Sequence, residues 1–193
     1  MRSAEFDKEK VLRAAIAAFV NKGYNKTSMQ DLKKATGLHP GSIYCAFENK
    51  EGLLIAALEQ YNKDRSGEFS DYFSGEKTVL AGLKNYLMQT VTNCTSDGPQ
   101  RVCFSQQALS ELTEQTSAVE AVITKNLNDW QQGFIWVFEQ ALAAGEIDNS
   151  RTGKQRTQSL VMGIYGLRTF AHTHPTVDVL EELATQLLED VSR

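Results

Sequence analysis

No hydrophobic run in this chain of 193 residues is long enough to cross a bilayer, and its first ten residues, MRSAEFDKEK, are too charged for a signal-peptide core. We therefore expect no membrane partner and a cytoplasmic location. Cysteine is scarce: residues 45, 94 and 103 are the three cysteines, and none belongs to a CxxC pair. This pattern disfavours both a secreted disulfide framework and a zinc ribbon, so we expect reduced thiols.

Catalytic and cofactor motifs are also missing. The sequence contains no P-loop, no GxSxG, no HExxH and no dinucleotide fingerprint. His172 and His174 form an HxH pair, but no third ligand is evident, so a helix-end role is favoured over a metal site. We expect that the protein is not an enzyme and binds neither a cofactor nor a metal.

Proline occurs only three times, and no alternating strand pattern of useful length appears. The chain is therefore predicted to be all-α, with an N-terminal three-helix domain over residues 1–50 and a larger helical domain over 51–193. The net charge of −4 is unevenly divided. Residues 1–65 hold 11 Lys and Arg against 8 Asp and Glu, whereas residues 66–193 hold 9 against 16. A locally basic N-terminal part is compatible with DNA binding in an acidic protein.

Two helices are predicted near the N-terminus. Asp7 caps the first, whose apolar residues repeat at helical period until Gly23 ends it. Thr27 is predicted to begin the second in a capping box with Gln30, and Gly37 ends that helix.

A third helix is expected to start at Pro40, since its first position needs no N–H, and to bury Ile43 and Phe47. Asn49 is a plausible cap for a long fourth helix that joins the two domains. Further helices are expected at roughly 77–94, 101–114, 117–144, 154–172 and 176–192.

Several separated motifs then agree in order and spacing: GY at 23–24, TG at 36–37, GSIY at 41–44, Phe47 and NKEGLL at 49–54. With them the N-terminal part resembles the TetR family of bacterial transcriptional regulators. The resemblance implies a homodimeric, all-helical repressor that binds a double-stranded DNA operator and is released by a small-molecule effector. A helical scaffold that binds only proteins remains the alternative from a different class.

The resemblance also implies roles for individual residues of the N-terminal domain. Phosphate contacts are implied for Thr27, Tyr44 and Lys50, and positions near base edges for Pro40, Gly41, Ser42 and Cys45. Two residues depart from the family pattern. His39 stands where a small hydroxyl cap is common, and Ala46 stands where histidine is common.

Aromatic residues at helical spacings are frequent in the larger domain, where most are expected to be ordinary core. The family resemblance implies an effector cavity among its helices. The candidate pocket residues are Tyr86, Cys103, Phe104, Gln107, Trp130, Phe134 and Tyr165.

Cys103 carries a separate hypothesis. The segment RVCFSQQALSEL resembles a subset of TetR-like regulators that sense oxidants or electrophiles through a cysteine, although Val102 replaces the usual glycine. In the first turn of a helix beside Arg101, the helix dipole and the cation would favour a thiolate, with Cys94 as a resolving thiol. The alternative is that Cys103 is a small buried hydrophobe.

The last two predicted helices carry more apolar surface than a lone hairpin can hide, and Gly163 and Gly166 permit close helix approach. We therefore predict a two-fold four-helix dimer interface. Its candidate residues are Leu160, Ile164, Leu167, Leu180, Leu183 and Leu187. The alternative is that these leucines pack only within one subunit.

Overall fold

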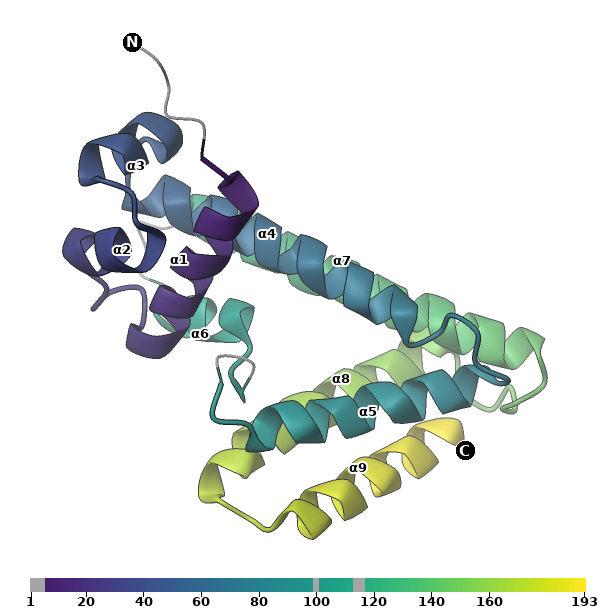
Figure 1. Cartoon of the computed structure of the whole chain (residues 1–193). Coiled ribbons are helices and arrows are strands. Elements are labelled where there is room, and N and C mark those ends of the chain that lie inside the picture. The colour runs from purple at the N-terminus through teal and green to yellow at the C-terminus, as the bar shows by residue number, and fades with distance from the viewer. Residues whose placement is uncertain (1–5, 99–100, 113–116) are drawn as a thin grey trace. The chain divides into compact units, whose positions relative to one another are not determined.

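The computed structural model describes residues 6–98, 101–112 and 117–193, and all regular elements in these ranges are helical, which confirms the all-α prediction. Figure 1 shows the helices in chain order. They are α1 (Lys8–Lys22), α2 (Met29–Thr36), α3 (Pro40–Phe47), α4 (Lys50–Asp71), α5 (Val79–Thr95), α6 (Phe104–Ser110), α7 (Ser117–Ala143), α8 (Gly153–Phe170), the 3₁₀ turn η2 (Ala171–Thr173) and α9 (Val177–Ser192). Among the described residues, no helix is both long and apolar enough to span a membrane.

The chain folds into two compact units, each with its own hydrophobic core. Unit 1 consists of Met1–Arg65 and Val102–Leu127, and unit 2 consists of Ser66–Arg101 and Asn128–Arg193. Packing therefore groups α6 and the start of α7 with the N-terminal helices. The functional boundary between residues 50 and 51 stays a prediction.

Unit 1 begins as the sequence indicates. The Asp7 carboxylate accepts a hydrogen bond from the Lys10 N–H at 3.1 Å and caps α1, and Gly23 ends α1 with a φ of 82°. Its core takes side chains from α1 to α4 and from α6 and α7, including Phe19, Leu32, Ile43, Phe47, Leu54, Leu58, Phe104 and Ile123. On the surface, the Arg13 guanidinium binds both oxygens of Asp64 at 2.8 Å and so ties α1 to α4.

The start of α2 differs by one residue from the prediction. Ser28, not Thr27, is the N-cap, and it forms the capping box with Asp31 instead of Gln30. Thr27 is buried, and its hydroxyl donates to the Gly23 carbonyl at 2.5 Å. The hydroxyl is therefore used to close the turn between α1 and α2, which leaves the cap to the next residue.

Unit 2 contains α5, α8 and α9, which pack against one another, and the later part of α7. Aromatic rings fill the α4–α5–α7 side of its core: Phe69, Tyr86, Trp130 and Phe134 meet edge to face, with centroids 5.1 to 5.8 Å apart. Gly163 brings α8 close to α9, because a Cβ there would overlap the Leu187 side chain.

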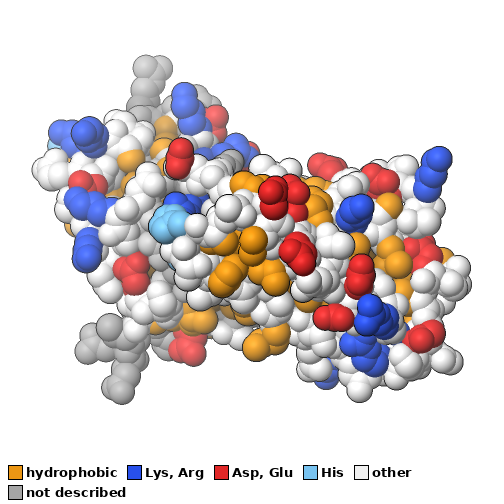
Figure 2. Space-filling model, turned by 90° about the horizontal axis from the view of Figure 1, so that it is seen from below, with side chains coloured by type: hydrophobic (Ala, Val, Ile, Leu, Met, Phe, Trp, Pro, Cys, Tyr) orange, Lys and Arg blue, Asp and Glu red, His pale blue; other side chains and the backbone are white. Residues whose placement is uncertain are grey.

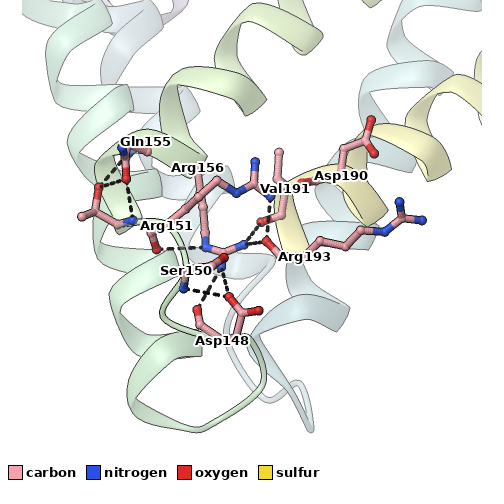
Figure 3. Close-up of polar contacts among 9 residues, drawn as sticks. Asp148, Ser150, Arg151, Gln155, Arg156, Asp190, Val191 and Arg193 are labelled. Atoms are coloured by element: carbon pink, nitrogen blue, oxygen red, sulfur yellow. Dashed lines mark hydrogen bonds and ion pairs between the residues drawn. The ribbon is translucent and has the colours of Figure 1, made fainter.

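A fully buried arginine holds the end of α9. Figure 3 shows the Arg156 guanidinium between the α7–α8 loop and the last turn of α9. Its Nη1 donates to the carbonyls of Val191, at 2.7 Å, and Arg193. Its Nη2 donates to the Asp148 carbonyl at 2.9 Å and to the Asp148 carboxylate at 3.0 Å, and its Nε donates to the Arg151 carbonyl at 3.3 Å. All three nitrogens are thus paired, as a buried cation requires.

The helix expected at 101–114 is much shorter than predicted. In the structure, α6 covers Phe104–Ser110, and Cys103 is its extended N-cap residue, with no side-chain capping bond. Placing Cys103 inside the first helical turn was therefore wrong. Val102 and Leu112, which lie just outside α6, also pack on the unit 1 core.

Candidate nucleic-acid interface

Helices α2 and α3 form the helix pair that the sequence predicted. Gly37 ends α2 in the left-handed conformation with a φ of 74°, and Ile43 and Phe47 anchor α3 in the core. This anchoring leaves the opposite side of α3 free. The Tyr44 side chain is 49% exposed, and Gly41 and Cys45 are also exposed, while Pro40 and Ser42 are half-buried. The structure thus brings these five candidate residues together on one short helix.

His39 caps α3. The imidazole Nδ1 accepts from the Gly41 N–H at 3.3 Å, and the His39 carbonyl accepts from Ser42 and Ile43 at 2.8 and 3.2 Å. Pro40 has no N–H to offer. The first turn of α3 therefore uses its own donors internally, and any contact with DNA must come from side chains or from close backbone approach at Gly41.

The start of α2 carries a carboxylate within its capping box. Asp31 accepts from the Ser28 N–H at 2.8 Å and from the Lys22 ammonium at 2.7 Å. Hydrogen bonds from Lys22 and Ser28 hold the pKa of Asp31 far below its usual value. Ser28 is exposed at the helix start, whereas Thr27, the candidate named from the sequence, has a buried hydroxyl that is already bonded.

Lys50, the third predicted phosphate ligand after Thr27 and Tyr44, lies half-buried at the start of α4. Its ammonium donates to the Tyr24 carbonyl at 2.5 Å and sits 4.3 Å from the centre of the Tyr24 ring. Burial lowers the pKa of Lys50, while the carboxylates of Glu111 and Asp31 oppose that change. The cation therefore lies against the α1–α2 turn.

The candidate pocket residues belong to two cores. Tyr86, Trp130, Phe134 and Tyr165 lie in unit 2, where the Trp130 indole N–H donates to the Tyr86 hydroxyl at 3.1 Å. The remaining three, Cys103, Phe104 and Gln107, belong to unit 1. Within unit 1, the Phe104 ring stacks on Phe19 at 6.3 Å, and the Gln107 amide donates to the Val20 carbonyl at 3.1 Å.

The candidate dimer residues are mostly internal. Leu160, Ile164, Leu167 and Leu180 are buried in the core of the single chain. Of the leucines named from the sequence, only Leu183, 36% exposed, and the half-buried Leu187 offer surface. Sequence reasoning named Gly166 but missed Met162 and Phe170, which lie on either side of it at helical spacing on the exposed side of α8; Met162 is 70% exposed.

Comparison with known proteins agrees with this architecture. The family model of bacterial regulatory proteins of the tetR family matches residues 11–57. The transcriptional repressor ComR of Escherichia coli is 35% identical over 105 residues, which cover 53% of this chain but only half the length of ComR.

Solved structures extend the likeness over nearly all of the chain. A cysteine mutant of the TetR-family regulator CifR, in complex with 26-base-pair operator DNA, matches with a TM-score of 0.84 and 25% identity over 95% of this chain and 96% of CifR. FadR of Bacillus subtilis in complex with stearoyl-CoA has the same fold, with a TM-score of 0.77 and 16% identity over 96% and 98% of the two chains. ComR and CifR are transcriptional regulators, which confirms the expectation that this chain is not an enzyme. The sequence match in the N-terminal helices and the shared fold identify this chain as a member of the TetR family of transcriptional regulators.

Proposed function

We propose that the protein is a homodimeric repressor that binds a palindromic operator through α3 and leaves it when a small-molecule effector binds. The observation that carries this proposal is the outward side of α3. It presents Tyr44 and Cys45 to solvent while Ile43 and Phe47 fix the helix in the core. A short, rigidly anchored helix with an exposed polar side is what entry into a major groove requires.

A second subunit is proposed to cover the outer sides of α8 and α9. Figure 2, which shows the face where α9 lies in Figure 1, has hydrophobic side chains gathered among acidic ones. Met162 and Phe170 on α8 and Val179 and Leu183 on α9 are exposed large apolar residues. A Cβ added at Gly166 would have no atom within 4 Å, so a partner helix has room to approach there.

The effector is proposed to bind among the aromatic side chains of unit 2. Trp130 and Tyr165 are half-buried there beside the buried Tyr86 and Phe134, so the first two offer ring surface that the core does not fully use. Aromatic rings with a few polar groups are typical linings of small-molecule sites. Effector binding must favour the DNA-free state by about 1 to 3 kcal/mol to act as a typical allosteric signal.

Electrophoretic mobility shifts with the DNA upstream of its own gene test the proposal. The wild type should retard one duplex as a dimer, and Tyr44→Ala should weaken binding. Arg193→Ala is a matched surface change far along the sequence and should not. A protein that ignores all duplexes at low ionic strength would support the scaffold alternative instead. A single-chain mass in light scattering would rule out the dimer.

A second candidate is thiol-based sensing through Cys103. It is favoured by one observation: Cys103 is only partly buried and directly precedes Phe104, which packs on the α1 core of unit 1. Modification of the thiol would therefore act next to a side chain that supports the DNA-reading helices. If Cys103→Ser leaves release by peroxide or quinones unchanged, this candidate is wrong.

A further inference from the structure

One peptide group in the α1–α2 turn is bound at both ends by opposite charges. The carbonyl of the Tyr24–Asn25 peptide accepts from the Lys50 ammonium at 2.5 Å. The N–H of the same peptide donates to the Glu111 carboxylate at 2.9 Å. A cation on the carbonyl side and an anion on the N–H side both favour the peptide dipole, so each contact strengthens the other. Glu111 and Lys50 are thus linked although 61 positions separate them in the sequence.

The Glu111 end of this arrangement is built into the fold. The Asn25 side-chain amide donates to the Glu111 carbonyl at 3.2 Å, which makes a second bond between the same two residues. Gly23 has a φ of 82°, and a Cβ there would lie 2.7 Å from a Glu111 carboxylate oxygen. The backbone conformation therefore favours glycine at this position, and the Glu111 carboxylate occupies the space that a Cβ would take.

Glu111 directly follows α6, and α6 contacts α1 through several side chains. Phe104 stacks on Phe19, and Gln107 donates to the Val20 carbonyl at 3.1 Å. Phe104, Gln107 and Glu111 follow one another at three- and four-residue steps, so they share one side of the segment. The segment from Phe104 to Glu111 therefore lies along the end of α1 and the turn after it.

We propose that Glu111 is a positioning residue for DNA binding: through the Tyr24–Asn25 peptide, its carboxylate holds the Lys50 ammonium at the α1–α2 turn and competes with operator phosphate for it. This inference rests on the proposed function, which assigns a phosphate contact to Lys50. Since coupling is reciprocal, a phosphate that draws Lys50 away weakens the Glu111–Asn25 contact, and a movement of α6 that withdraws Glu111 changes the affinity of Lys50 for phosphate.

A double-mutant cycle with the upstream duplex tests the proposal. Glu111→Gln keeps an oxygen that accepts from Asn25 but removes the charge. This variant should bind the duplex about two- to fivefold more tightly at low salt, which corresponds to the free energy of an exposed charge pair. Lys50→Ala should lower the salt slope by about one, and in that background Glu111→Gln should have no effect. A Glu111→Gln effect of the same size with and without Lys50 would overturn the proposal.

Glu51→Gln is the matched control. Glu51 is adjacent to Lys50 in the sequence, and its negative charge helps to raise the pKa of Tyr24. It is not among the carboxylates that shift the pKa of Lys50. Its removal should change affinity by the same factor whether or not Lys50 is present. If the effect of Glu51→Gln on affinity depended on Lys50 as strongly as that of Glu111→Gln, any nearby carboxylate would act in the same way. That result would reject the proposed link through the peptide.

Amide hydrogen exchange at Asn25 separates failure of this inference from failure of the proposed function. In the free protein the Asn25 N–H should be protected in the wild type and in Glu111→Gln, and unprotected in Glu111→Ala. Addition of the duplex should reduce the protection. An unprotected Asn25 N–H in the free wild type overturns the inference. A protected N–H in a chain that binds no duplex rejects the DNA-binding proposal and leaves the peptide contact intact.

Discussion

Replacement of Arg156 by alanine gives the sharpest test of how unit 2 is held together. The guanidinium is fully buried and bonds to four residues of two segments, the α7–α8 loop and the end of α9. Its removal leaves the carbonyl of the buried Val191 without this donor, which costs about 1 to 3 kcal/mol, and it also breaks the bonds to Asp148, Arg151 and Arg193. The ion pair with Asp148 adds little, since that side chain is 64% exposed.

We therefore expect Arg156→Ala to lower the free energy of unfolding by about 3 to 5 kcal/mol. For a chain of this length, such a loss corresponds to a fall in the melting temperature of roughly 10 °C. Arg156→Lys should recover only part of the loss, because one ammonium cannot serve the loop and the helix end together.

Urea unfolding followed by circular dichroism measures these differences. Arg193→Ala is the control, since its side chain is 75% exposed and reaches Glu189 only at 3.5 Å; its cost should be under about 0.5 kcal/mol. A loss below about 1 kcal/mol for Arg156→Ala would refute the reasoning that buried acceptors depend on this side chain.

Three further predictions concern unit 1 and the thiols. Thr27→Val should lower the free energy of unfolding by about 1 to 2 kcal/mol in thermal unfolding, since it removes the hydroxyl bonded to Gly23, and a neutral result would reject that bond. Arg13 lowers the pKa of Asp64, so the stabilising effect of this pair is present above the usual carboxyl pKa and is lost as pH falls through the lowered value. The stability difference between wild type and Arg13→Ala should therefore shrink between pH 7 and pH 3, and a constant difference in urea titrations would contradict the assignment. A thiol reagent should label exposed Cys45 first and Cys94 only on unfolding, because burial raises the pKa of the Cys94 thiol; early labelling of Cys94 in a peptide map would show that its core opens.

Much of unit 1 follows from local chemistry. Asp7, Gly23 and Gly37 bound their helices as predicted, since caps and left-handed glycines act through neighbouring backbone groups. The predicted start of α2 was wrong by one residue because two capping patterns overlap: Thr27 with Gln30, and Ser28 with Asp31. Which residue becomes the N-cap depends on the hydrogen bond from the Thr27 hydroxyl to the Gly23 carbonyl. The sequence spacing of capping residues does not predict this bond.

Packing across long sequence distances explains the remaining differences. Phe104 and Tyr86 are both aromatic residues that the sequence analysis placed in one candidate pocket. Phe104 belongs to the core of unit 1, whereas Tyr86 belongs to the core of unit 2. Leu160 and Leu183 both repeat at helical period, but only the second reaches the surface. The Glu111–Asn25 contact joins residues 86 positions apart, and neither residue type signals it in advance.

The passage of the chain between units limits how this regulator can be recombined with its relatives. In a hybrid that takes only the first 65 residues from another protein, the residues around position 19 would come from that protein. They would have to pack against Phe104, Ala108 and Ile123 of this chain, which belong to the same core. Exchange of the proposed DNA-reading helices without loss of folding therefore needs junctions at 65/66, 101/102 and 127/128, so that Val102–Leu127 stays with those helices.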